Sequence, residues 1–338
     1  MRILVLGGTV FLGRHVAAEA LARGHELTLF TRGIHGGDLF PEAERLRGDR
    51  SKDVSALRGR SFDAVIDTCG YEPADVAASA EAVADGDPHY VFVSSCNAYP
   101  AWPAEAVDED SPTWEGGPEE YGPDKVRCER AAEAALPGRV AVVRAGLIVG
   151  PHDGVFRLPW WVRRIAAGGD VPAPGEPARE LQIIDARDLA AWMLDLAERR
   201  VAGAFNGTGP AGMTTMGELL GAAVEATGSG ARLHWIPERA LRSAGVEPWT
   251  ELPLWAPEDE LAGAWLTGTE RARAAGLRCR RVADTVADVA AWLRDGGEAE
   301  LSDWGSHARP APMGAEREAE LLAYVRSSDL IVPSPSVQ

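Results

Sequence analysis

The sequence RILVLGGTVFLG (residues 2–13) runs from an apolar stretch into a glycine-rich turn and decides the fold. Residues Arg2–Leu6 have the composition of a strand that is buried on both faces. The following run, Leu12–Arg23, carries apolar side chains at helical spacing. Glycines between a first strand and a helix let backbone N–H groups approach a pyrophosphate closely. The stretch therefore predicts a dinucleotide-binding turn, in which Val10 replaces the middle glycine of the usual pattern.

Alternating strands and helices continue along the first half of the chain. Short apolar runs predict further strands at Glu26–Thr31, Ala64–Asp67, Tyr90–Ser94 and Val140–Val143. Helical spacing recurs between them, at Pro73–Ala84 and Lys125–Ala135. This alternation is typical of parallel βαβ units. We therefore expect an α/β fold with a Rossmann-type doubly wound parallel sheet.

The pattern changes after about Gly150, where loops rich in Pro, Gly and Trp begin. We expect residues 1–150 to form the dinucleotide-binding domain, joined by returning segments near 181–205. Residues 151–330 are expected to form mainly a smaller, interleaved C-terminal α/β substrate lobe. Single helices are predicted after Gly150 at Leu189–Glu198 and Val282–Leu293. A linker at Gly305–Gly314 is expected to lead to a last helix at Ala315–Val325, followed by a flexible tail at 331–338.

Composition argues against several classes of protein. The 51 acidic and 34 basic residues give a net charge of −17, and a negative field repels nucleic-acid phosphates. No run approaches the roughly 18 apolar residues of a membrane span, and the N-terminal apolar run is too short for a signal peptide. The four cysteines are scattered, which is typical of reduced thiols. We expect a cytoplasmic protein with no membrane, nucleic-acid or metal partner.

The residue at the end of the second strand is expected to choose between NAD and NADP. An acidic side chain there binds the ribose 2′-hydroxyl, whereas arginine accommodates a 2′-phosphate. Arg32 in this position favours NADP(H), with NAD(H) as the alternative if Arg32 is merely a solvated surface residue. Asp49, in the Gly48-Asp49-Arg50 turn, is a candidate for the adenine edge or for a helix cap.

Tyr121 and Lys125 stand four residues apart, so they share one face of a helix. Only two of the 34 basic residues are lysines, which suggests that arginine could not serve at position 125. An ammonium beside a phenol stabilises the phenolate and suits the tyrosine to proton transfer. Upstream, Ser95 ends a predicted strand and could donate to a substrate oxygen, with Ser94 as a backbone contact to the cofactor.

With these motifs the sequence resembles the extended short-chain dehydrogenase/reductase superfamily, the NAD-dependent epimerase/dehydratase group, in a reductase-like subgroup. The resemblance implies a nicotinamide cofactor, Ser95, Tyr121 and Lys125 as the catalytic triad, and homodimers. It also implies that Gly146 and its neighbours pack against the nicotinamide. The expected cofactor contacts are Gly7, Thr9, Val10, Phe11, Leu12, Gly13, Arg32, Asp49, Arg50, Thr68, Cys69, Ser94, Tyr121, Lys125, Ala145 and Gly146.

The chain departs from the sugar-nucleotide members of this group at two places. Leu147 stands where those members usually have Asn, and Leu181 stands where they have Arg, although Arg179 nearby could compensate. Cys96 and Asn97 replace the Asp-Glu pair of the sugar dehydratases. Weak candidates for substrate contacts are Cys96, Asn97, Trp160 and Arg179. Trp160, Trp161, Trp249 and Trp255 could also wall a less polar pocket, or could simply pack in the core.

These features favour an NAD(P)-dependent reductase or dehydrogenase acting on a small metabolite. The first alternative is an epimerase that retains its cofactor and acts on a sugar or nucleotide-sugar. The alternative from another class is a non-catalytic dinucleotide-sensing or RNA-associated binding protein. The complete Ser95, Tyr121 and Lys125 set and the negative charge argue against this last possibility.

Overall fold

The computed structural model describes residues 1–100, 105–257, 262–297 and 312–327. The predicted tail at 331–338 and most of the predicted linker lie outside the described residues. The chain divides into two compact units, which are described separately. Unit 1 comprises Met1–Ile148, Ile183–Pro210 and Leu266–Cys279, and unit 2 comprises the rest.

A seven-stranded sheet in the order β11-β6-β5-β4-β1-β2-β3 forms the centre of unit 1, with neighbouring strands parallel. The order reverses on the two sides of β1, as in a doubly wound sheet, and the crevice at such a reversal is where these folds bind ligands. The predicted fold class is therefore confirmed. The strands are β1 Arg2–Leu6, β2 Glu26–Thr31, β3 Glu44–Arg47, β4 Ala64–Asp67, β5 His89–Ser95, β6 Val140–Ala145 and β11 Gly203–Gly207.

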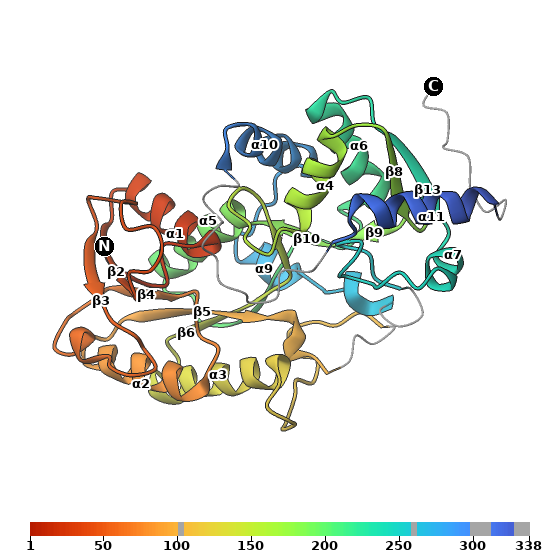
Figure 1. Cartoon of the computed structure of the whole chain (residues 1–338). Helices are drawn as coiled ribbons and strands as arrows, with labels where there is room; N and C mark the ends of the chain where they lie inside the picture. The colour runs from red at the N-terminus through yellow and green to blue at the C-terminus, as the bar shows by residue number, and fades with distance from the viewer. Residues whose placement is uncertain (101–104, 258–261, 298–311, 328–338) are drawn as a thin grey trace. The chain divides into compact units, whose positions relative to one another are not determined.

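Two pairs of helices cover the two faces of this sheet (Figure 1). One face carries α1 (Phe11–Ala22) and α5 (Ala186–Glu198), and the other carries α2 (Pro73–Val83) and α3 (Tyr121–Ala135). Successive side chains of β1 alternate between the two cores, because strand residues point to opposite faces in turn. Both faces are buried, which explains why the strands read as continuous apolar runs.

Short elements complete unit 1 around this sheet. Two of the strands, β7 (Leu147–Val149) and β10 (Ile183–Asp185), pair with each other. A 3₁₀ turn, η3, follows β5 directly and spans Cys96–Ala98. The remaining elements are the turns η1 Ser55–Leu57 and η2 Ala84–Gly86 and the helix α9 Glu270–Ala274.

Unit 2 contains helices and two small sheets, β8 with β13 and β9 with β12. Trp160, Trp161 and Trp255 are buried in it, and the indole of Trp161 donates to the Pro253 carbonyl at 2.6 Å. These three tryptophans pack in the core, which is the alternative to the predicted pocket wall. The elements are α4 Arg157–Ala166, β8 Asp170–Pro174, β9 Glu180–Leu181, β12 Thr214–Thr215, α6 Met216–Thr227, β13 Arg232–Ile236, α7 Glu238–Ser243, η4 Ala262–Trp265, α10 Val282–Arg294 and α11 Ala315–Ser327.

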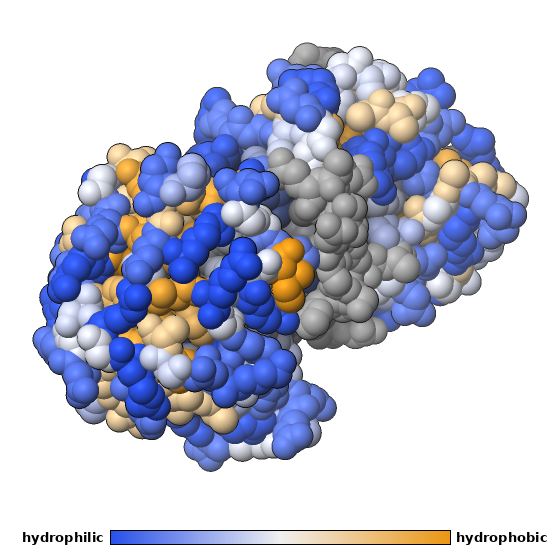
Figure 2. Space-filling model, turned by 60° about the vertical axis from the view of Figure 1, so that its left-hand side comes forward, coloured by the Kyte–Doolittle hydropathy of each residue, from blue (hydrophilic) through white to orange (hydrophobic). Residues whose placement is uncertain are grey.

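All four cysteines are free thiols, with Cys96 and Cys128 buried and Cys69 and Cys279 half-buried. Hydrophilic side chains are interspersed with hydrophobic ones over the face of the protein shown in Figure 2. Across the described ranges, no helix has the length and apolar character needed to cross a membrane.

Candidate functional site

The glycine turn after β1 forms a tight cradle. Gly7 has a φ of +90°, and a Cβ at Gly13 would lie 2.3 Å from the Gly7 carbonyl oxygen, so helix and turn are in backbone contact. Val10 is the N-cap of α1, and within the described part of the chain α1 has neither a side-chain cap nor an acidic residue in its first turn. The first N–H groups of α1 therefore need another acceptor. This cradle fits the pyrophosphate of a dinucleotide.

Two arginines lie together at the carboxyl ends of β2 and β3. Arg32 is exposed, and among the described residues its side chain has no hydrogen-bond or ion-pair partner. Thr31 pairs in register with Arg47, and a Cβ at Gly33 would lie 3.2 Å from Arg47 Nε. Sequence reasoning missed Arg47, although its place at the end of the third strand could have indicated it. The Arg47 side chain thus lies beside the segment that carries Arg32.

Arg50 was predicted to contact the cofactor, but its guanidinium group binds partners inside the protein. Its guanidinium binds both carboxylate oxygens of the fully buried Asp67, at 2.8 and 2.9 Å, and also donates to the Asp75 carbonyl. Tyr90 donates a further hydrogen bond to Asp67 at 2.8 Å. Burial disfavours the ionised carboxylate, but Arg50 and Tyr90 outweigh it and hold the pKa of Asp67 below its ordinary value. Arg50 thus fixes the end of β4.

Asp49 lies in the turn before this arginine and organises it locally. Its carboxylate accepts from the Ser51 hydroxyl at 2.8 Å and pairs with Lys52 at 3.1 Å. The Ser51 hydrogen bond and then Lys52 lower the pKa of Asp49 to about 2. Asp49 therefore stabilises its own turn and, among the described residues, caps no helix, and the adenine contact stays a prediction.

The segment after β4 lies against the glycine cradle. Thr68 Oγ1 donates to the Leu6 carbonyl at 2.9 Å, and a Cβ at Gly7 would be 3.0 Å from Cys69 Cβ. Burial raises the pKa of the Cys69 thiol to about 11, so the thiol is neutral. The two residues predicted here as cofactor contacts therefore adjoin the turn.

A buried polar network ties α3 to the ends of β5 and β6. Ser94 Oγ donates to Glu129 at 2.5 Å, and Arg144 donates to both oxygens of the same carboxylate, at 3.1 and 2.9 Å. Arg144 also donates to the Tyr99 hydroxyl, which donates to Asn206 Oδ1 at 2.7 Å. The Ser94 side chain is thus used inside the protein, which leaves its backbone for the predicted cofactor contact.

Close backbone packing joins the segments that carry Ser95 and Tyr121. The Ser95 hydroxyl oxygen accepts a hydrogen bond from the backbone N–H of Asn97 at 3.1 Å, so the hydroxyl proton can be donated to another group. A Cβ at Gly122 would lie 2.4 Å from the Asn97 carbonyl oxygen, which itself accepts from the Trp114 indole at 3.0 Å. Only glycine lets the first turn of α3 approach η3 this closely.

Tyr121 is the first residue of α3 and is 49% exposed. A helix N-terminus favours negative charge, so this position stabilises a phenolate. A phenol that is half open to its surroundings can exchange a proton with a ligand. Neighbouring Asn97 is exposed, whereas the Cys96 thiol is buried and donates to the Arg144 carbonyl.

Lys125 lies one turn further along α3 and is buried. Its Nζ donates to the carbonyls of Gly70 and Val93, at 2.7 and 2.6 Å. An ammonium has three protons, so one is left for another acceptor. Burial lowers the pKa of Lys125 to about 8, and it carries a positive charge at neutral pH.

The remaining predicted residues differ in their surroundings. Ala145 is buried, and a Cβ at Gly146 would lie 2.3 Å from Thr208 Oγ1, so this part of the sheet edge is closely packed. In unit 2, Trp160 is buried and packs edge-on against Trp161 at 4.7 Å between ring centroids, and its predicted substrate contact stays a prediction. Arg179 is half-buried.

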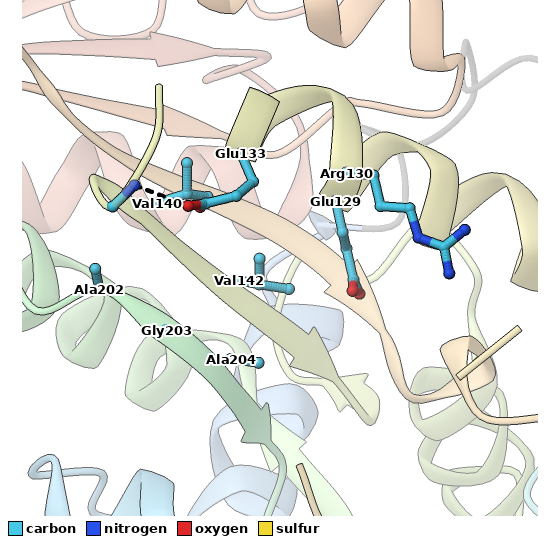
Figure 3. A pocket seen from close by; sticks show the side chains of 9 residues that line it. Glu129, Arg130, Glu133, Val140, Val142, Ala202, Gly203 and Ala204 are labelled. Carbon is cyan, nitrogen blue, oxygen red and sulfur yellow. Dashed lines mark hydrogen bonds between the residues drawn. The ribbon is translucent and has the colours of Figure 1, made fainter. Parts of the chain in front are cut away.

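An open groove lies elsewhere in unit 1, between α3 and the strands β6 and β11 (Figure 3). Small apolar side chains such as Val140, Val142 and Ala204 form its floor, and Glu133 accepts from the Gly138 amide at 2.7 Å at one end. These residues occupy the amino-terminal halves of their strands. The groove is therefore separate from the cradle and from Tyr121.

Comparison with known proteins assigns this arrangement to a family. The sequence profile of the NAD dependent epimerase/dehydratase family matches residues 3–207, the span that holds the cradle, Ser95, Tyr121 and Lys125. The chain belongs to this family. The chain is similar to the epimerase family protein SDR39U1 of Bos taurus, with 32% identity over 246 residues, 68% of this chain and 81% of that protein.

Solved structures of the epimerase fold agree with the observed topology. The Bordetella bronchiseptica enzyme WbmH in complex with NAD+ has a TM-score of 0.67 and 19% identity, and the match covers 88% of this chain and 99% of WbmH. Human SDR39U1 with NADPH has a TM-score of 0.59 and 23% identity over 86% of this chain and 99% of that protein. The two structures contain different nicotinamide cofactors.

Proposed function

We propose that this member of the epimerase/dehydratase family is an NADP(H)-favouring reductase or dehydrogenase that acts on a carbonyl or hydroxyl of a small metabolite. The observation that supports the proposal is the approach of Gly122 to Asn97, which packs the first turn of α3, with Tyr121 one helical turn before Lys125, against the segment that follows Ser95. A bound nicotinamide supplies or accepts a hydride. Side chains of unit 1 transfer the proton and orient the substrate oxygen.

Each of the three side chains has a distinct role. Ser95 donates its hydroxyl proton to the substrate oxygen, since its lone pair already accepts from Asn97. Tyr121 gives that oxygen a proton during reduction and removes one during oxidation. Lys125 supplies positive charge beside the phenol and keeps one proton for a cofactor or substrate hydroxyl.

NADP(H) preference rests on Arg32 and Arg47. Arg32 has no protein partner within the described ranges, and a charge-assisted arginine–phosphate contact contributes about 1.5–3 kcal/mol. Replacing Arg32 with Ala should therefore weaken NADPH binding by about 10- to 100-fold. NADH lacks the 2′-phosphate, so its binding should change little. Equal losses for both nucleotides in calorimetric titrations would remove Arg32 from this role.

Tyr121→Phe tests the proposed chemistry directly. The variant keeps the ring and removes the only group assigned to proton transfer, so turnover should fall by about 100-fold or more while NADPH affinity stays unchanged. Activity should be sought as oxidation of NADPH with a panel of small aldehydes and ketones. A Tyr121→Phe protein as active as the parent would end the proposal.

An epimerase is the second candidate, since the family profile is that of epimerases and dehydratases. An epimerase oxidises and then reduces one substrate, and it holds its cofactor through the cycle. Protein purified without added nucleotide can be denatured and the released nucleotide identified by mass spectrometry. Stoichiometric NAD would favour the epimerase, whereas empty protein that binds NADPH reversibly would favour the reductase.

A further inference from the structure

Tyr71 lies beside the Lys125 ammonium and has no role in the reaction described above. It follows β4 in the loop that leads to α2, and 58% of its surface is exposed. The Lys125 Nζ lies over its ring at 5.4 Å from the ring centroid. On another side, Nζ lies over the buried Phe92 ring at 4.5 Å. The ammonium is therefore covered by one internal ring and one exposed ring.

Gly70 explains how the chain brings Tyr71 to this place. A Cβ at Gly70 would lie 2.6 Å from the Phe92 ring and 2.7 Å from Val76, so any larger residue would push the loop outward. The Gly70 carbonyl accepts from Lys125 at 2.7 Å, and Tyr71 is the next residue. The backbone contact and the ring contact with Lys125 are thus made by adjacent residues.

We propose that the Tyr71 ring is the outer cover of the Lys125 ammonium, a positioning residue that limits its hydration and thereby sets the pH range in which Tyr121 and Lys125 work together. The second half of this statement rests on the proposed function, because it requires Tyr121 to transfer a proton. The first half is a property of the folded chain alone. The two halves can therefore be tested separately.

The ring of Tyr71, and not its hydroxyl group, covers the Lys125 ammonium in this proposal. Crowding by the surrounding protein, and then the nearby Tyr121, raise the pKa of Tyr71 to about 12, so the hydroxyl remains protonated at neutral pH. It does not compete with Tyr121 as a proton carrier. The ring is the part of Tyr71 that contacts the ammonium, so phenylalanine should replace it.

The other groups around Lys125 do not account for its low basicity. Asp67 on β4, Cys69 after it, and Cys128 and Glu129 on α3 all act to raise the pKa of Lys125, and burial alone lowers it, to about 8. Loss of the Tyr71 ring has two opposed effects. It removes a cation–π contact that is weak at 5.4 Å, and it admits water to the ammonium. Hydration is the larger effect, so removal of the ring should raise the pKa of Lys125.

The scarcity of lysine allows a direct measurement. Protein grown with carbon-13 lysine contains two labelled side chains, Lys52 and Lys125, and Lys52 is 78% exposed and serves as an internal standard. A Lys52→Arg variant assigns the two Cε signals. Titration of these signals against pH gives the pKa of each amine without any substrate, nucleotide or assumption about the reaction.

Tyr71→Ala should raise the pKa of Lys125 by about one unit, toward its ordinary value, and leave Lys52 unchanged. Tyr71→Phe should match the parent protein. Because Tyr71 is exposed, both variants should fold, and Tyr71→Leu replaces the alanine variant if that one does not. A pKa for Lys125 that stays within about 0.3 unit of the parent in the ring-less variant would refute the cover.

The pH profile of turnover then tests the second half. If the cover sets the working range, the alkaline limb of kcat should move upward in Tyr71→Ala by the same amount as the Lys125 titration, and Tyr71→Phe should restore it. A shifted titration with an unshifted kcat profile would keep the cover and refute its link to proton transfer. Failure to find any activity would count against the proposed function and would leave the titration result standing.

Discussion

Gly122→Ala tests whether the backbone contact between α3 and η3 positions the catalytic groups. The added Cβ would lie 2.4 Å from the Asn97 carbonyl oxygen, and an ordinary contact begins at 3.4 Å. Relief of the clash therefore requires a shift of 3.4 − 2.4 = 1.0 Å between the segments that carry Tyr121 and Ser95. A misplacement of about 1 Å can reduce turnover by about 100-fold.

The effect on folding should be much smaller than the effect on turnover. Overpacking costs about 1–3 kcal/mol, but alanine is favoured over glycine in a helix by about 1 kcal/mol. The free energy of unfolding should therefore fall by at most about 2 kcal/mol. The cradle contains neither Gly122 nor Asn97, so NADPH affinity should change far less than turnover. Steady-state kinetics, calorimetric NADPH binding and urea unfolding measure the three quantities.

Gly221→Ala is the matched control. Gly221 lies inside α6, and a Cβ there would meet no atom within 4 Å. This change should increase the free energy of unfolding by about 0.5–1 kcal/mol and leave turnover unchanged. If Gly122→Ala reduced kcat by less than about threefold, the backbone contact would not be what positions Tyr121, and the reasoning would be wrong.

Three further substitutions separate structural from chemical roles. Arg50→Met leaves the buried Asp67 without its cation and should cost about 3–5 kcal/mol. In the parent protein the pKa of Asp67 lies below its value in the unfolded chain, so the stability that the ionised carboxylate contributes is lost only as the pH falls below about 4. In the variant the pKa of the unpaired Asp67 is raised, so the free energy of unfolding should increase when the pH is lowered from 7 to 5. Urea titrations that showed the same pH dependence for both proteins would contradict this reasoning. Glu129→Gln leaves Arg144 buried without its counter-ion and should lower the free energy of unfolding by about 3 kcal/mol. A loss of less than about 1 kcal/mol, measured by thermal unfolding, would show that the network is dispensable. Lys125→Arg should reduce kcat far more than stability, because a guanidinium is larger and cannot make the same two carbonyl contacts; equal losses would indicate a purely structural lysine.

The local signals in the sequence were sufficient for five of the seven strands of the sheet and for the helix α3. Strands buried on both faces read as apolar runs, and the strands β1, β2 and β4 begin and end where those runs do. The pair Tyr121 and Lys125 follows from helical spacing, because four residues make about one turn. Such features depend on neighbours in the sequence, and they can be predicted one segment at a time.

The roles of Arg50 and Ser94 could not be predicted in this way. Arg50 binds Asp67, and Ser94 binds Glu129, a residue of the following helix. Neither pair has a spacing that marks it, since the partners meet only after the strands have paired and the helices have packed on the sheet. Arg50 was expected to contact the cofactor because of the family resemblance, which carries no information about its ion pair with Asp67. Buried charge pairs of this kind become visible only in three dimensions.

The state of the four thiols has a consequence for how the protein responds to oxidants. Burial raises the pKa of Cys69 and Cys279 to about 11, and that of Cys96 and Cys128 to about 12. Peroxide and alkylating reagents attack the thiolate, which is scarce at neutral pH in all four positions. The chemistry proposed for Tyr121 and Lys125 should therefore continue under oxidative stress. A single cysteine introduced on the surface would also react selectively, which would give a site for attaching a spectroscopic probe.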